Sequence, residues 1–215
     1  MKRTLIIACI VSMFSSFVHA QDFRYGFIGG VNLSRPVGDV HPDGVKTGML
    51  LGVKGELGIP AIAKGVYTDF EVQISAKGYK SPFLLNDNNE MLQTKMNIYY
   101  LNIPIQIGYK LKCSNSLSLF ASVGPYFGLG LWGKANYYNN DKKYDSSSAV
   151  FDKHGFKRFD CGLGMNIGLE YAKHYQFAIG YSRGLKNISK LEDWNHRNNW
   201  VHKNRYFTFS LGYLL

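Results

Sequence analysis

Hydrophobic and polar side chains alternate strictly between residues 99 and 109, which read YYLNIPIQIGY. The odd positions are all apolar or aromatic, and the even positions are mostly polar or small. A period of two is typical of a β-strand whose two faces meet different surroundings. A strand of this length, at about 3.3 Å per residue and tilted by about 45°, just crosses the hydrocarbon core of a bilayer. Tyrosine stands at both ends, where its hydroxyl group reaches headgroup water, so we interpret the segment as a membrane-spanning strand.

The same period recurs along the chain. The eight predicted strands cover residues 23–33, 49–59, 66–78, 95–111, 117–132, 157–171, 174–185 and 205–215. Their connections alternate long and short, which is typical of outer-membrane barrels with long outer loops and short periplasmic turns. An even number of strands places both ends of the mature chain on the periplasmic side. We therefore expect an all-β fold, an eight-stranded antiparallel up-and-down transmembrane β-barrel, without a second domain.

Aromatic residues support this topology, because they gather at the two expected rims of the barrel. Five tyrosines fall near the periplasmic rim: Tyr25, Tyr109, Tyr171, Tyr175 and Tyr213. Four aromatic residues fall toward the outer rim: Tyr99, Phe159, Tyr181 and Phe207.

The alternative fold is a soluble lipocalin-like barrel, in which the apolar positions would face an inner cavity. Here the polar positions hold many glycines and charges of both signs, namely Lys54, Glu56, Asp69, Glu71, Lys77, Lys110, Asp160 and Glu170. The interior of an eight-stranded barrel is just wide enough to be filled by side chains. Paired charges and glycines suit such a filled polar lumen, so we expect the apolar positions to face lipid. The same narrow interior excludes an open porin.

The first residues resemble a secretory leader. Lys2 and Arg3 precede an apolar run that ends at Val18, and Ala20 closes an A-x-A-like cleavage site. The run is short of the roughly 20 residues that a transmembrane helix needs. We therefore expect residues 1–20 to be a signal peptide and residues 21–215 to be the barrel domain. Of the cysteines beyond the leader, Cys113 lies in a predicted turn and Cys161 in a strand, and we expect no disulfide between them.

Two prolines interrupt the predicted strands. Pro104 lies in the inward phase and Pro125 in the outward phase, at nearly the same height on neighbouring strands. Because proline removes a ladder hydrogen bond, we predict a bulge or missing hydrogen bonds between these strands.

Motifs that carry chemistry are weak in this chain. Residues 180–184 match G-x-S-x-G, but a nucleophile elbow needs a strand, a sharp turn and a helix, so Ser182 is more simply a small inward residue. Residues 128–133 spell G-x-G-x-x-G without a βαβ unit around them. His196 and His202 have no third ligand at a convincing spacing, and we interpret them as solvated loop residues. We expect no catalytic, cofactor-binding or metal-binding residues, and no enzyme activity.

Basic residues exceed acidic ones, and the full chain has a formal charge of +10. Seven of the basic residues fall in or beside the expected outer loops: Lys134, Lys142, Lys143, Lys190, Arg197, Lys203 and Arg205. They could contact phosphates of lipopolysaccharide or other surface glycans, although ordinary solvated charge is the simpler interpretation. Nucleic acid is excluded as a partner by the expected location.

Six segments resemble the PorT-like outer-membrane β-barrel family. They read GGVNLS, YLNIPIQIGYK, GPYFGLGLWGK, DCGLGMNIGLEY, YSRGLKNI and SLGYLL, and they span essentially the whole mature chain in order. The resemblance implies an outer-membrane barrel with a signal peptide. The family's name also links it to type IX protein secretion, but fold similarity alone does not transfer that role.

The main functional hypothesis is a non-enzymatic integral outer-membrane barrel with a structural or surface-interaction role, carried by its four outer loops. An accessory role in type IX secretion or envelope assembly is the alternative, and a lipid-modifying enzyme is a third, disfavoured one. Expected partners are outer-membrane lipid, lipopolysaccharide, the barrel-assembly machinery during insertion, and a secretion or surface partner that the sequence does not name.

Overall fold

A computed structural model describes residues 23–39, 42–82, 84–85, 90–152, 155–190 and 200–215. The expected leader, with its cleavage site and Cys9, lies outside these residues, as do His196 and Arg197. The long strands are β1 (Phe23–Ser34), β3 (Lys46–Gly58), β4 (Val66–Lys80), β6 (Met91–Lys112), β7 (Leu117–Asn139), β9 (Phe159–Tyr171), β10 (Tyr175–Gly184) and β12 (Arg205–Leu214). The short ones are β2 (Val37–Gly38), β5 (Leu84–Leu85), β8 (Lys142–Ser147) and β11 (His202–Lys203). No helix in the described part of the chain is long and apolar enough to span a membrane.

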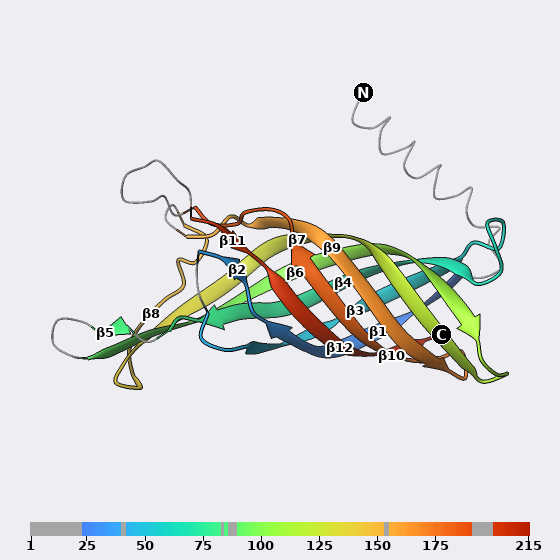
Figure 1. Cartoon of the computed structure of the whole chain (residues 1–215), viewed down its shortest axis with the longest axis horizontal. Helices are drawn as coiled ribbons and strands as arrows, with labels where there is room; N and C mark the ends of the chain where they lie inside the picture. Colours follow the sequence, from blue (N-terminus) through green and yellow to red (C-terminus); the bar gives the residue numbers. More distant parts are fainter. Residues whose placement is uncertain (1–22, 40–41, 83, 86–89, 153–154, 191–199) are drawn as a thin grey trace, which may run out of the picture.

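The long strands close into a single antiparallel barrel (Figure 1). Each pairs with its neighbour in sequence, β12 pairs with β1, and every one of these pairings is antiparallel. The predicted eight-stranded up-and-down barrel is therefore confirmed. Closure leaves no free edge in the ring, so every ring strand finds backbone partners on both sides.

Apolar side chains cover the outer wall and polar ones fill the inside. Ile103, Ile105, Leu163 and Phe209 are between 36% and 52% exposed. Lys54, at 6%, is typical of the buried charged residues. This is the orientation that the alternation predicted, and it is the reverse of a lipocalin-like barrel.

The two ends of the barrel differ. The turn end holds the short connections 59–65, 113–116 and 172–174 together with the C-terminus, and the loop end holds the long connections and β2, β5, β8 and β11 (Figure 1). At the turn end the chain reverses at Ala172 and Lys173, which have φ values of 52° and 64°. The C-terminus is held there, because the Leu215 amide donates to the carbonyl of Tyr25 at 2.7 Å. The tyrosines expected at one rim all lie on the outer wall at this end and are exposed.

Two strands extend well past the barrel at the loop end. β6 and β7 pair from Leu92 and Asn139 down to the ring, and β8 and β5 flank them (Figure 1). We call residues 91–98 of β6, 133–139 of β7 and β8 the tongue. The sequence predicted loops over residues 80–94 and 133–156. This prediction was wrong where these ranges contribute to the tongue, because the residues there form strands. Strands outside the bilayer carry no lipid-facing apolar phase, so alternating hydrophobicity could not indicate them.

A β-bulge at the loop end changes the phase of β7. The register shifts between Tyr99 and Tyr100, so that Tyr99 lies opposite Trp132 while Tyr100 lies opposite Gly130. Leu131 is the extra residue of the bulge, and Trp132 takes the outward place, with its ring centroid 5.2 Å from that of Tyr99. Alternation alone could not indicate the bulge, because the inserted residue leaves no hydrophobic signal.

The predicted disturbance around the prolines is confirmed as missing pairs. Between β6 and β7 the pairing stops after Pro104 and Tyr126 and resumes in the same register at Ile107 and Val123. Between β4 and β6 it also lapses, between Phe70–Ile105 and Gln73–Asn102. The prolines thus remove hydrogen bonds locally without shifting the register.

Candidate functional site

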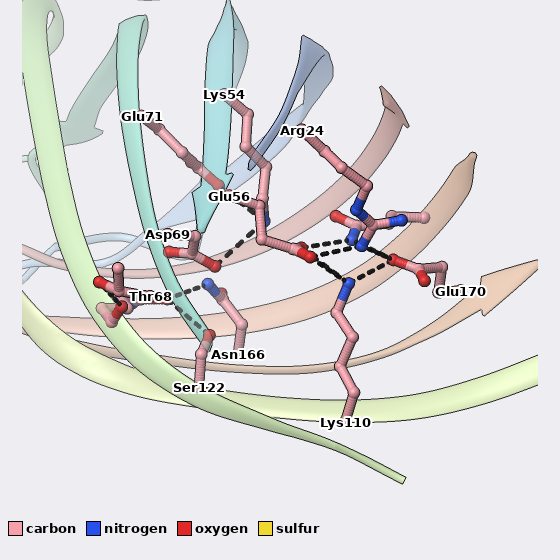
Figure 2. A network of polar contacts seen from close by, with 12 residues as sticks. Arg24, Lys54, Glu56, Thr68, Asp69, Glu71, Lys110, Ser122, Asn166 and Glu170 are labelled. Atoms are coloured by element: carbon pink, nitrogen blue, oxygen red, sulfur yellow. Dashed lines mark hydrogen bonds and ion pairs between the residues drawn. The ribbon is translucent and has the colours of Figure 1, made fainter. Parts of the chain in front are cut away.

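The lumen near the turn end holds a network of paired charges (Figure 2). Lys110 lies between two carboxylates: its Nζ donates to Glu56 Oε1 at 2.6 Å and to Glu170 Oε2. Arg24 Nη2 donates to Glu170 Oε2 at 2.8 Å and to Glu56. Gln176 Nε2 donates to Glu170 Oε2 at 2.8 Å. Residues from five strands thus tie the ring together from inside.

A second group of charges lies beside the first (Figure 2). Lys54 Nζ is 3.2 Å from Asp69 Oδ2 and 3.3 Å from Glu71 Oε1, and all three side chains are at most 5% exposed. Gln73 Nε2 donates to Glu71 Oε2 at 2.7 Å. One ammonium group therefore contacts two carboxylates among side chains that are almost fully buried.

The middle of the lumen is filled by uncharged polar side chains. Ser122 Oγ and Asn166 Nδ2 each donate to Gln106 Oε1 at 2.7 Å. A cavity of about 50 Å³ remains beside them, and Ser182 lines it. Ser182 lies within the regular strand β10, and no histidine is among the described residues that line this cavity. The interpretation of Ser182 as a small inward residue is confirmed.

Further toward the loop end, one lysine lies among three tyrosines. Lys77 Nζ is 4.9 Å from the ring centroid of Tyr100, 5.1 Å from that of Tyr126 and 4.2 Å from that of Tyr206. The Tyr126 hydroxyl donates to Asp160 Oδ2 at 3.1 Å. Lys77 thus makes cation–π contacts where the inward residues Lys54 and Lys110 make ion pairs.

The loop end of the lumen is closed by an apolar cap. The cap consists of Ile98, Tyr100, Val150, Phe151, Phe156 and Ile188, all buried. The loop that carries Val150 and Phe151 is held in place by Lys190. Its Nζ donates to the carbonyls of Phe151 at 2.8 Å and Asp152 at 2.9 Å. At the turn end, by contrast, a cavity of about 930 Å³ opens between Arg24, Lys110, Lys112 and Lys173. The described interior therefore braces the wall, is open at the turn end and is covered by the apolar cap at the loop end.

His202 is part of this closure, and its interpretation as a solvated residue was wrong. Its side chain is buried, with the ring centroid 4.8 Å from that of Phe156 and 5.2 Å from that of Tyr79. The loop folds back over the mouth because the His202 amide donates to Asn187 Oδ1 at 2.9 Å and its carbonyl accepts from the Ile188 amide at 2.9 Å. A contact with a distant loop leaves no local signal in sequence.

Acid is expected to loosen the cap. Burial lowers the pKa of His202 from 6.5 to about 4, and its Nδ1 has no hydrogen-bond partner among the described residues, so the closed cap holds the neutral ring. Only the opened state binds a proton between these values, so the closed state loses stability as the pH falls from about 6.5 to about 4, by at most about 3 kcal/mol. Amide hydrogen exchange of Phe156 and Ile188, corrected for intrinsic rates, should accelerate over this range. His202→Phe should remove the pH dependence, and an unchanged profile in that variant would contradict the assignment.

The expected basic residues have different surroundings. Lys134, Lys142 and Lys143 are exposed, whereas Lys190 binds carbonyls of the cap loop. Arg205 is half-buried, and its Nε donates to the carbonyl of Arg35 at 3.1 Å. The sequence reading missed Arg35, Lys80, Lys95 and Arg183, which lie at the same end. Each stands in the outward phase, two to four residues past the last outward apolar residue of its strand, and that position is a signal that could have found them.

Other site chemistry is sparse in the residues that the structure describes. Cys113 and Cys161 are both free. Among the described residues, no group of three or more His, Cys, Asp or Glu side chains is placed to hold a metal ion.

The match to a protein family agrees with the geometry. A family model described as an outer membrane protein beta-barrel domain matches residues 18–190. The crystal structure of Ail, the attachment invasion locus protein of Yersinia pestis, in complex with the heparin analogue sucrose octasulfate is similar at 15% identity, with a TM-score of 0.44 over 91% of this chain and 100% of that one. OprG from Pseudomonas aeruginosa is similar at 15% identity, with a TM-score of 0.46 over 89% and 95%. Neisserial surface protein A is similar at 12% identity, with a TM-score of 0.44 over 90% and 99%. No curated protein matches the sequence.

Proposed function

The chain belongs to the outer membrane protein beta-barrel domain family, and from this premise we propose that it is a closed, non-enzymatic barrel that presents the tongue as a binding surface outside the cell. Both mature termini and the short turns then face the periplasm. The PorT-like assignment within this broader family stays a prediction from the motifs quoted above.

The observation that carries this proposal is the paired structure of the tongue. The ladder between β6 and β7 continues without a break from the Tyr99–Trp132 pair to the Leu92–Asn139 pair, about 25 Å along the strands. Backbone pairing holds these residues in one shape, so side chains on them can be recognised without the cost of ordering a free loop.

Exposed residues on the tongue suit recognition. Tyr144 of β8 is 61% exposed, and Lys134, Lys142 and Lys143 are also exposed on the tongue. Aromatic and basic side chains of this kind supply large contact area and charge. The lumen offers nothing comparable, because the cap and the filled interior exclude ligands from the loop end.

Thiol labelling of intact cells tests the orientation. The native Cys113 is exposed in the turn between β6 and β7. A maleimide polymer too large for porins should leave the wild-type protein unlabelled in intact cells and label Cys113 after the outer membrane is permeabilised. A Cys113→Ser, Tyr144→Cys variant should be labelled in intact cells. Labelling of the wild-type protein before permeabilisation would contradict the proposed orientation.

Crosslinking from the same position tests the binding role. A photoreactive residue at Tyr144 should give a defined crosslinked species in intact cells, and one at Ile62, which is exposed in a turn at the other end, should not. Equal patterns from both positions would contradict a role for the tongue.

A further inference from the structure

Three arginines lie in a row across three neighbouring strands at the loop end. Arg183 of β10 lies directly opposite Arg205 of β12. The row continues to Arg35, whose amide donates to the carbonyl of Arg205 at 2.9 Å, one step past the Ser34–Tyr206 pair. The side chains of the three arginines point outward, because each lies two residues from a side chain that faces outward. These neighbours are Tyr181 for Arg183, Phe207 for Arg205 and Leu33 for Arg35. The row therefore projects on the outer wall.

Lysines form a similar group on another part of the wall. Lys80 of β4 lies directly opposite Lys95 of β6. Lys134 of β7 lies opposite Asn97, which is two residues closer than Lys95 to the Tyr99–Trp132 pair. These three lysines share the outward phase of Tyr99 and Trp132. We call the six residues Arg35, Lys80, Lys95, Lys134, Arg183 and Arg205 the basic belt.

Like charges directly opposite each other destabilise a sheet unless something neutralises them. Within the described part of the chain, none of the belt side chains forms an ion pair with a carboxylate. Lys95 lies over the ring of Tyr138, 4.1 Å from its centroid. Burial, followed by the charges of Lys80 and Lys95, lowers the pKa of Lys46, which begins β3 at the same end. The belt thus concentrates positive charge that the described protein does not balance.

The height of the belt points to the anion that balances it. The belt lies within two to four residues of the outward aromatic side chains, where lipid headgroups begin. At the turn end the corresponding outward positions are apolar: Phe23, Leu111 and Leu215 are all exposed there. The two leaflets therefore meet different chemistry, and both groups of belt cations lie at the leaflet of the loop end.

We propose that the basic belt binds the phosphate groups of lipopolysaccharide in the outer leaflet. Guanidinium groups in a row match phosphate oxygens through paired hydrogen bonds, and the lysines add point charges. The inference rests on the orientation given under the proposed function, but it does not depend on any role of the tongue.

A charge-matched pair of variants tests the belt. In the belt variant, Arg35, Lys80 and Arg183 become glutamine, and Arg205 is kept because its Nε holds the carbonyl of Arg35. In the control variant, Lys64, Lys112 and Lys173, which are all exposed and lie outside both the belt and the tongue, become glutamine. The full-length refolded proteins are titrated with fluorescent rough lipopolysaccharide in a neutral detergent. Heat-modifiable migration on gels verifies that each variant is folded.

The belt variant should bind lipopolysaccharide about tenfold more weakly than the wild type or worse, and the control should stay within about twofold, because only the belt charges lie at the height of the phosphate groups. Dephosphorylated lipopolysaccharide should bind the wild type and the belt variant equally. Equal affinity of all three proteins for the phosphorylated form would overturn the proposal. Displacement of lipopolysaccharide by millimolar inorganic phosphate would also overturn it, since that would indicate a site for free phosphate.

If the belt variant does not fold, Lys80 and Arg183 alone are changed and compared with a matched change of Lys64 and Lys112. The purified protein reports on the belt whatever its orientation in the cell, and the labelling of Cys113 reports on orientation alone. Failure of one experiment is therefore distinguishable from failure of the other.

Discussion

Replacing Lys54 with methionine is expected to lower the free energy of unfolding by about 3–5 kcal/mol, because it removes one partner of a buried ion cluster. The change leaves Asp69 and Glu71 without the ammonium group that lies 3.2 Å and 3.3 Å from them. Methionine fills a similar volume, so the loss reports charge rather than a cavity. Urea unfolding of the protein in lipid vesicles, followed by tryptophan fluorescence, measures it.

Lys112→Met is the matched control, since Lys112 is exposed and forms no ion pair with any residue that the structure describes. It should change the free energy of unfolding by less than about 0.5 kcal/mol. Adding Asp69→Asn and Glu71→Gln to Lys54→Met should restore most of the loss, because no unpaired charge then remains. A triple variant as unstable as the single one would show that the charges are not the cause.

Gly168→Val is expected to lower the stability of the barrel by about 3 kcal/mol or more, because the lumen has no room for a side chain there. A Cβ atom at Gly168 would lie 2.2 Å from the carbonyl oxygen of Phe177 and 2.5 Å from Cζ of Phe120. The first contact is with the backbone of β10, so rotating the phenyl ring cannot relieve it. The folded fraction after refolding into detergent, measured by heat-modifiable migration on gels, should fall steeply.

Gly29→Val provides the comparison, because Gly29 faces the lipid and its nearest contact would be Leu51 Cδ1 at 3.7 Å. Valine favours strands and adds apolar surface toward lipid, so this variant should refold as well as the wild type. Equal behaviour of the two valine variants would contradict a filled lumen. Phe120→Ala combined with Gly168→Val should recover only part of the loss.

Both predictions depend on contacts that the sequence indicated in kind but not in detail. Alternation indicated that Lys54 and Asp69 face the lumen, and their strands are neighbours in sequence, so a pairing between them could have been anticipated. Arg24 and Glu170 lie in the first and sixth strands expected from the sequence, and they meet only because the ring closes through β12. A pattern of period two gives the face of each residue but not its height relative to a distant strand.

Other features were absent from the pattern altogether. The tongue lies outside the bilayer, so no lipid imposes alternation on it. His202 is buried by a loop that folds back on the mouth, and Leu131 is displaced by a bulge. The arginine row depends on the register of three strands, which hydrogen bonding sets and composition does not.

The sequence by itself determined that Ile105, Leu163 and the other apolar residues of the same phase face lipid. A bilayer tolerates apolar side chains on the wall, and it requires that every backbone hydrogen-bonding group be paired within the barrel. From that requirement followed the number of strands, their direction and the polar interior. Only the tertiary structure decided which inward charges pair, how the mouth is closed, and where unbalanced cations gather on the outer wall. Those features depend on the relative heights of strands and loops, which closure of the ring fixes.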